Sequence, residues 1–155
     1  MKKIDSLNQV AEFHRTFNAP ILETPQIPSK ERCELRVSLL QEELNELKQA
    51  IEDNDLVEIA DALCDLQYVL SGAVLEFGLG EKFVELFNEV QRSNMSKACE
   101  TELQAQETVE HYKAKGEEAL YEKSGNKFNV HRISDNKVLK NKYYSAADLK
   151  SIIEK

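Results

Sequence analysis

The chain has 155 residues, of which 41% are hydrophobic and 31% are charged, and its formal net charge at pH 7 is -8. This length suits a single domain with an apolar core of ordinary size. The acidic balance argues against a non-specific nucleic-acid binder, which needs a basic face. It leaves open an enzyme of nucleotides, because metal ions neutralise carboxylates and phosphates alike.

The cysteine pattern and the N-terminal residues indicate a cellular compartment. Cys33, Cys64 and Cys99 form an odd set without metal-type spacing, which predicts reduced thiols. The segment 1–5 lacks the apolar run of a signal peptide. The apolar stretch 56–75 carries three acidic residues, which disfavours a membrane span. We therefore expect a cytoplasmic protein with no membrane partner.

Helices dominate the expected secondary structure. The low content of glycine and proline, five and three residues, favours helices over a turn-rich β fold. All three prolines fall in one loop, 18–29. The expected helices cover 4–17, 29–51, 56–77, 81–97, 100–123 and 145–154. Residues 127–133 are expected to form a short strand or an extended loop, so the predicted fold class is all-α.

The helix expected over 29–51 carries a carboxylate on its core-facing side. Successive residues of a helix turn by about 100°, so Glu43 falls inside the apolar arc, between Leu47 and Leu39, and Glu46 lies at its edge. Acidic side chains are rarely buried without a partner. Glu43 is therefore a candidate functional residue.

The helix expected over 56–77 is apolar on nearly every side, so we expect it to be buried on most sides. Its charges are Glu58, Asp61 and Asp65, which share an arc of about 60°. Gly72 on the same side would leave room beside them. Because buried like charges are costly without cations, and this helix has no Lys or Arg, the cluster indicates Mg²⁺ or Mn²⁺.

Two other interpretations of the acidic cluster remain open. The carboxylates could form a solvated face of an ordinary helical bundle, or they could pair with basic residues of another helix or subunit. A di-iron centre is disfavoured, because it needs Glu-x-x-His pairs and the sequence has none.

The end of the helix expected over 81–97 offers a cation. Asn94 and Lys97 fall on the same side as Phe83 and Phe87, so we expect both to face inward. Lys97 then has two readings, a phosphate contact or a basic residue that favours the helix dipole.

These acidic motifs resemble those of the all-α nucleoside triphosphate pyrophosphohydrolases, which include MazG-like proteins, dimeric dUTPases and phosphoribosyl-ATP pyrophosphohydrolase. Glu42-Glu43-x-x-Glu46 is similar to the first half of the family motif. Glu58-x-x-Asp61 matches the second half literally. The second-helix ligand nevertheless stays open between Glu58 and Asp61, because an alternative alignment of the motif, with Asp65 as its final acidic residue, fits the surrounding residues better.

A MazG-like subgroup provides that alignment. Asp65-Leu-Gln-Tyr68-Val69, followed by Gly72, resembles the run after its final acidic ligand. Asn94-Met-Ser96-Lys97 resembles its Asn-x-Ser-Lys element, and Asp135-Asn-Lys137-Val-Leu-Lys140 resembles its C-terminal element. The resemblance covers 4–98 and 134–154, which leaves 99–133 as a polar insertion in a single domain, 1–155.

The resemblance implies hydrolysis between the α- and β-phosphates of a nucleoside triphosphate, with Mg²⁺ or Mn²⁺ as cofactor. The implied metal ligands are Glu43, Glu46, Asp61 and Asp65. The implied catalytic bases are Glu42 or Glu58. The implied substrate-binding residues are His14, Tyr68, Asn94, Lys97, Lys137 and Lys140.

The expected assembly is a four-helix-type bundle completed by dimerisation, as a homodimer or a dimer of dimers, because the apolar second helix needs a cover. The main alternative function is a non-catalytic sensor or interaction module that binds metal and nucleotide on the same fold. A purely structural bundle is a third reading.

Overall fold

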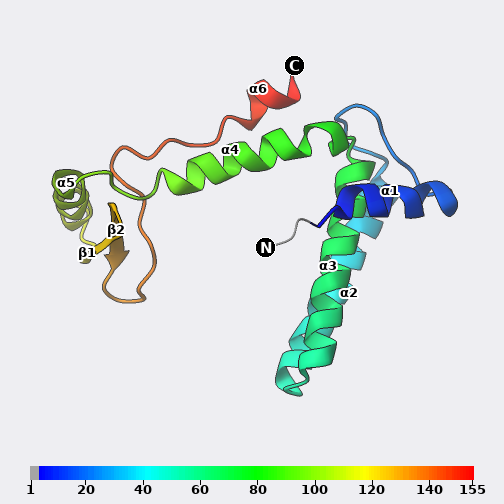
Figure 1. Cartoon of the computed structure of the whole chain (residues 1–155), viewed down its shortest axis with the longest axis horizontal. Helices are drawn as coiled ribbons and strands as arrows, with labels where there is room; N and C mark the ends of the chain where they lie inside the picture. The colour runs from blue at the N-terminus through cyan, green and yellow to red at the C-terminus, as the bar shows by residue number, and fades with distance from the viewer. Residues whose placement is uncertain (1–3) are drawn as a thin grey trace. The chain divides into compact units, whose positions relative to one another are not determined.

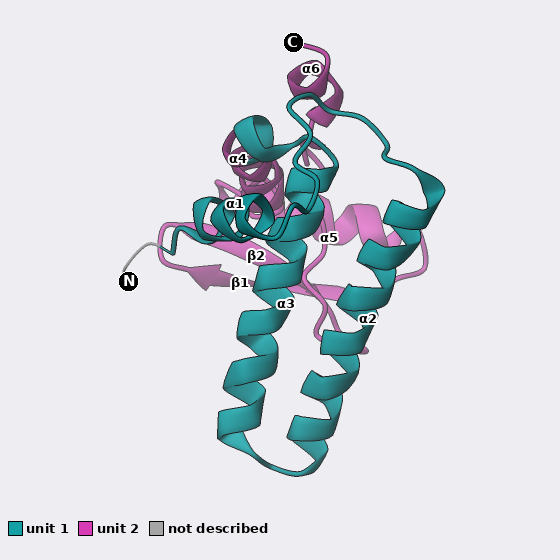
Figure 2. Ribbon diagram, turned by 90° about the vertical axis from the view of Figure 1, so that its right-hand side faces the viewer, with its two compact units in different colours: residues 1–83 teal, residues 84–155 magenta. Residues whose placement is uncertain are grey.

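The computed structural model describes residues 4–155 (Figure 1), and the chain divides into two compact units, residues 1–83 and 84–155 (Figure 2). In the described part, 58% of the residues are helical, in six α-helices and a short 3₁₀ helix, which confirms the all-α class. The single domain expected over 1–155 stays a prediction. The net charge of -8 resides in the first unit, because acidic and basic residues balance over 84–155.

The first unit is built on an antiparallel pair of long helices, with a shorter helix against them. Its helices are α1 (Ser6–Thr16), α2 (Lys30–Glu52) and α3 (Leu56–Glu76), followed by a 3₁₀ turn at Gly80–Lys82. Ser29 caps α2 by accepting a hydrogen bond from the Arg32 amide, and Asp55 caps α3 through the amides of Val57 and Glu58. These caps fix the expected breaks at the start of α2 and between α2 and α3.

The core of this unit lies at the C-terminal end of α3, where Val10 and Ala11 of α1 pack with Leu75. The other end of α3 is open: Leu56 is 78% exposed and Leu63 is 52% exposed. The expectation that α3 is buried on most sides is therefore wrong for its N-terminal half. The cause is that only α2 accompanies α3 there, whereas α1 and the proline-containing loop join them at the other end.

That loop is held against the end of α3 by backbone hydrogen bonds. The amide of Leu22 donates to the Leu75 carbonyl, and the amide of Gln26 donates to the Phe77 carbonyl, both at 3.1 Å. Gly78 adopts a left-handed backbone (φ +67°), and a Cβ there would lie 1.9 Å from the Thr24 carbonyl oxygen. Only glycine fits this approach.

The second unit combines helices with a β-hairpin. Its helices are α4 (Phe83–Met95), α5 (Glu102–Lys113) and α6 (Leu149–Ile153). β1 (Ala119–Ser124) and β2 (Lys127–Arg132) pair antiparallel, from Ala119 opposite Arg132 to Ser124 opposite Lys127. Cys99, Ala105, Val130 and Leu139 form the buried core between α5 and the hairpin.

Several expected bounds shift in this unit. The strand expected over 127–133 is present, but the helix expected over 100–123 ends at Lys113, and β1 follows it. Gly116, with φ +81°, makes the reversal after α5. The last helix begins after Asp148 instead of Ser145, because the Ser145 amide donates to Ser96 Oγ at 3.0 Å.

Two further expectations concern cysteines and membranes. Cys33, Cys64 and Cys99 are all free thiols. Within residues 4–155, no single helix has the length and apolar character to cross a membrane, and α3 with the helical residues after it passes only as a bent pair, on length and composition alone.

Candidate active site

Glu43 is the centre of the acidic group in the first unit. Its side chain is half-buried on the side of α2 that faces α3. Glu43 on α2 and Asp65 on α3 are equally distant in sequence from Asn54, which lies in the turn between the two helices. Burial, followed by the negative charges of Asp65, Glu46, Glu42 and Asp61, raises the pKa of Glu43. The structure thus brings these carboxylates from both helices into electrostatic reach of one another.

Glu58 lies outside this group. It is an exposed residue in the first turn of α3, next to the turn that joins α2 and α3. Its charge is not among those that raise the pKa of Glu43. Asp61 is one turn further along α3 and does act on Glu43. Of the two candidate second-helix ligands, Asp61 therefore lies closer to the acidic group.

The negative charge of this group lacks a basic partner in the protein. Across residues 4–155, the ion pairs of Lys, Arg and His all involve other acids than Glu43, Asp61 and Asp65. Carboxylate oxygens are the donors that Mg²⁺ and Mn²⁺ prefer, so the donor chemistry fits such an ion. In the same described residues, no three His, Cys, Asp or Glu side chains converge closely enough to form a finished metal centre.

Further along the same two helices lies a basic pair that the sequence analysis missed. Glu76 of α3 is fully buried and accepts hydrogen bonds from Arg32 and Arg36 of α2, with Arg32 Nε at 2.9 Å. Burial alone would raise the pKa of Glu76, but the hydrogen bonds from the two guanidinium groups outweigh it and lower that pKa. Arg36 precedes Glu43 by two helical turns, about 10 Å, so this pair is committed to Glu76 and not to the acidic group.

His14 is buried beside this basic pair, with 2% of its surface exposed. Its Nδ1 lies 2.8 Å from the Pro20 carbonyl oxygen, which can only accept, so Nδ1 carries the proton. A Cβ at Gly72 would lie 3.0 Å from His14 Nε2 and 2.6 Å from Arg36 Nη1. Gly72 therefore makes room for His14 and Arg36. The expectation that it makes room for the carboxylates is wrong.

Tyr68, the other substrate-binding candidate of the first unit, lies on the α1 side of α3. Its ring meets Phe13 edge-on, with centroids 5.6 Å apart, and 39% of the residue is exposed. Tyr68 is thus accessible, whereas His14 is enclosed.

The remaining candidates all belong to the second unit, where three of them gather at the end of α4. Lys97 Nζ donates to Asn94 Oδ1 at 2.8 Å. The backbone amide of Asn141 donates to the Lys97 carbonyl, which brings Lys140 alongside, with its ammonium 4.5 Å from the Tyr144 ring centroid. These contacts make a small basic and aromatic cluster.

Lys137, three residues before Lys140 in the sequence, lies next to β2. Its carbonyl accepts from the Arg132 amide at 2.9 Å, its own amide donates to Asp135 Oδ1, and the residue is exposed. The structure therefore places Lys137 apart from the contacts of Lys97.

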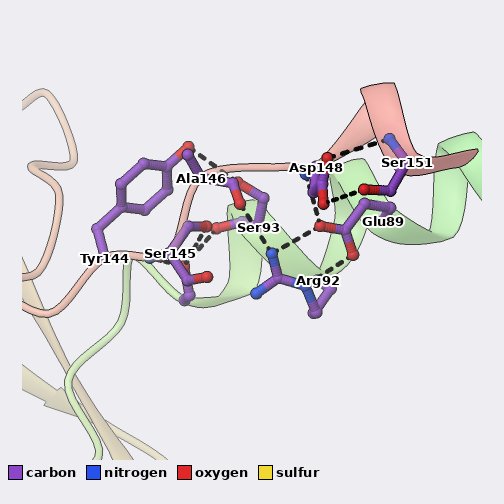
Figure 3. A network of polar contacts seen from close by, with 9 residues as sticks. Glu89, Arg92, Ser93, Tyr144, Ser145, Ala146, Asp148 and Ser151 are labelled. Atoms are coloured by element: carbon purple, nitrogen blue, oxygen red, sulfur yellow. Dashed lines mark hydrogen bonds and ion pairs between the residues drawn. The ribbon is translucent and has the colours of Figure 1, made fainter.

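The segment after Lys140 is anchored to α4 by a polar network (Figure 3). Hydrogen bonds from Arg92 and from the Asp148 amide lower the pKa of Glu89 to about 2. Arg92 also donates to the Ala146 carbonyl, and Tyr144 Oη lies 2.8 Å from Ser93 Oγ. This network fixes the course of the chain from Tyr144 to α6.

Comparisons with known proteins identify the family of the chain. A family model described as phosphoribosyl-ATP pyrophosphohydrolase matches residues 10–94. An uncharacterized protein of Acanthamoeba polyphaga mimivirus is 24% identical to this chain, and the match covers 99% of this chain and 97% of the viral protein.

The family match spans more than half of the chain and includes all six candidate carboxylates. The chain belongs to the phosphoribosyl-ATP pyrophosphohydrolase family, within the all-α nucleoside triphosphate pyrophosphohydrolase superfamily. The protein is thus a pyrophosphohydrolase that acts on a nucleotide, and its family generally depends on divalent metal ions. Lys97, Lys137 and Lys140 lie beyond the matched residues.

Proposed function

We propose that the protein hydrolyses a nucleoside triphosphate between its α- and β-phosphates and releases a nucleoside monophosphate and pyrophosphate. The observation that carries this proposal is the acidic group around Glu43, which joins α2 and α3 inside the family match and lacks a basic partner among the described residues. An enzyme that cleaves a phosphoanhydride needs such oxygen donors for a divalent ion.

The metal ligands in this proposal are Glu43, Glu46, Asp61 and Asp65. Bound Mg²⁺ or Mn²⁺ would neutralise the phosphates and lower the pKa of a bound water. Asp61 is favoured over Glu58 as a ligand because its charge acts on Glu43. Glu46, Asp61 and Asp65 are all exposed, so their side chains have room to change rotamer, and the proposal requires such changes to bring them to a common ion.

The general base is Glu42 or Glu58. A base must lie within hydrogen-bond reach of the water that it deprotonates. The negative charge of Glu42 acts on Glu43 and that of Glu58 does not, which supports Glu42.

Substrate binding is assigned to the cluster of the second unit. Lys97 and Lys140 would bind phosphate oxygens as point charges, Asn94 would orient phosphate or sugar, and Lys137 would contribute from beside β2. For the nucleoside we retain Tyr68, which is accessible, and we assign His14 to internal packing because of its burial and its bond to Pro20.

A homodimer, or a dimer of such dimers, is part of the proposal. Exposed apolar side chains recur every seven residues on each long helix, which aligns them on one face. On α2 they are Val37, Leu44 and Ile51, and on α3 they are Leu56, Leu63 and Leu70. These six residues are called the apolar stripes below. The α2–α3 pair of a second copy of the chain would bury both stripes in a four-helix arrangement.

A turnover assay tests the proposal. Purified protein is incubated with a panel of ordinary and modified nucleoside triphosphates and Mg²⁺, and released pyrophosphate is measured. We expect release with at least one substrate, loss of it in EDTA, and a loss of about 100-fold or more in Asp65→Asn. Glu52→Gln, an exposed acid at the far end of α2, serves as the control with unchanged activity.

Amide variants separate the competing ligands. Asp61→Asn should abolish most turnover, and Glu58→Gln should retain more of it. Full activity in both Asp61→Asn and Asp65→Asn would show that the metal site is misplaced. Thermal stabilisation by Mg²⁺ and nucleotide without any pyrophosphate release would instead support the non-catalytic sensor.

A further inference from the structure

Asn141 is an almost fully buried polar residue, 6% exposed, on the segment between β2 and α6. It holds the chain that follows α4: its backbone amide donates to the Lys97 carbonyl and its side-chain Nδ2 donates to the Ala98 carbonyl, both at 3.1 Å. Two bonds to successive residues fix the direction in which the chain leaves Lys97.

The same side chain also fixes the residues around Lys140. Asn141 Oδ1 accepts from the Tyr143 amide at 3.0 Å, and the Asn141 carbonyl accepts from the Tyr144 amide at 2.8 Å. This turn sets Tyr144, whose ring lies beneath the Lys140 ammonium. Asn141 thus bonds to the backbone of the segment that follows α4, at Lys97 and Ala98, and to the backbone of the segment that contains Tyr143 and Tyr144.

Helix α5 contacts Asn141 and its neighbours through Thr108 and Tyr112. Thr108 is fully buried, and its Oγ1 accepts from the Lys142 amide at 3.1 Å. Its one hydroxyl proton is shared between the Gln104 carbonyl at 2.7 Å and Asn141 Oδ1 at 3.4 Å. One helical turn on, Tyr112 Oη donates to the Lys140 carbonyl at 3.2 Å.

These contacts give the segment 99–133 a role. Its buried core of Cys99, Ala105 and Val130 makes α5 and the hairpin a rigid support. Buried polar groups in a low-dielectric interior accept only arrangements that satisfy them. The support therefore selects one course for residues 140–144, and with it one placement of Lys140 relative to Lys97.

We propose that Thr108 and Asn141 are positioning residues that hold Lys97 and Lys140 in register for the phosphate chain of the substrate, and that α5 and the β-hairpin form the support for this register. The inference rests on the proposed function, in which these two lysines bind phosphate. Neither Thr108 nor Asn141 touches the substrate. Their loss should weaken binding of the phosphate chain and leave the chemical step in place.

The test compares Thr108→Val, which keeps the shape and removes the hydroxyl, with Thr108→Ser, which keeps the hydroxyl. Steady-state kinetics are measured on the best triphosphate, and binding of inorganic pyrophosphate with Mg²⁺ is measured by calorimetry. We expect Thr108→Val to raise KM and the pyrophosphate Kd by about tenfold with kcat within about twofold. Thr108→Ser should restore both to within about twofold. Glu110→Gln, an exposed change on α5, is the control.

A second variant covers the case in which Thr108→Val does not fold. Tyr112→Phe removes only the bond to the Lys140 carbonyl at the edge of the cluster, and it should raise KM about twofold to threefold. Thr108→Val or Tyr112→Phe protein that folds and keeps the wild-type KM and pyrophosphate Kd overturns the positioning role, while active wild-type protein leaves the proposed function standing. Wild-type protein that neither hydrolyses triphosphates nor binds pyrophosphate refutes both.

Discussion

The carboxylate of Glu76 is completely buried against the guanidinium of Arg36, which reaches it across the α2–α3 interface. Arg32 completes this arrangement from one turn earlier on α2. The two arginines and Glu76 form a charged layer next to the core of the first unit, separate from the acidic group around Glu43.

Removal of the charge of Glu76 should destabilise the protein strongly. Glu76→Gln leaves two guanidinium groups without a counter-charge, and we expect the free energy of unfolding to fall by about 3–5 kcal/mol, as when one partner of a buried ion pair is removed. Urea unfolding followed by circular dichroism measures the change. Glu34→Gln, which breaks an exposed pair with Lys30, should cost less than about 1 kcal/mol; equal losses in the two variants would contradict the role of the layer.

Glu43 should have the opposite influence on stability. Because its pKa is raised, the folded state holds the proton more tightly than the unfolded state. Its stabilising contribution is complete below the unfolded pKa, about 4.3, and is lost as the pH rises through the folded pKa. In EDTA at neutral pH, Glu43→Gln should therefore raise the melting temperature, and this gain should shrink as the pH falls toward about 4.

A divalent metal ion should change the effect of Glu43→Gln on the melting temperature, because Glu43 is a proposed metal ligand. Mg²⁺ should raise the melting temperature of the wild-type protein more than that of Glu43→Gln, because the cation relieves the same repulsion that the amide removes. Scanning calorimetry with and without EDTA makes the comparison. A lower melting temperature of Glu43→Gln in EDTA at neutral pH would show that Glu43 is not the strained member of the group.

Gly78→Ala should displace the proline-containing loop. A Cβ at this position would lie 1.9 Å from the Thr24 carbonyl oxygen, and φ is +67°. We expect a loss of about 2–4 kcal/mol, from the left-handed backbone and from the clash together. Gly116→Ala is the matched control, because its φ is +81° but the space around it is open, so the backbone term of about 1 kcal/mol remains alone. Chemical denaturation distinguishes the two.

Leu63→Glu should separate the proposed dimer. Leu63 lies in the middle of the α3 apolar stripe, and a buried charge there opposes pairing. Light scattering coupled to gel filtration should give a mass of twice 17.7 kDa for the wild type and 17.7 kDa for the variant. Leu103→Glu, a change at an exposed leucine of α5, should keep the dimer. A monomeric wild type would remove the dimer from the proposal.

The long helices were predictable because their signals are local. Ser29 and Asp55 cap α2 and α3 where the sequence indicates, and apolar spacing sets both lengths to within a residue or two. The same spacing predicts that Glu43 lies within the apolar arc of its helix, and in the structure Glu43 is half-buried and the charge of Asp65 on α3 raises its pKa. For these elements a short stretch of sequence contains the whole cause.

The features that the sequence analysis missed depend on distant partners. Glu76 looks like an ordinary acid at the end of a helix, and only the packing of α2 on α3 gives it Arg32 and Arg36. β1 continues a polar stretch of sequence expected to be helical, and its strand conformation depends on pairing with β2. The start of α6 moves to Asp148 because Ser96 binds the backbone of Ser145.

The concentration of the net charge in residues 1–83 affects how a substrate arrives. A bare triphosphate, the proposed substrate, would approach the acidic α2–α3 pair against electrostatic repulsion, whereas the same nucleotide with a divalent ion attached would carry less negative charge and meet a weaker barrier. Added salt screens this repulsion within about a Debye length. Under the proposed function, the acidic α2–α3 pair would therefore favour metal-complexed over free nucleotide by encounter rate, before any side chain makes contact.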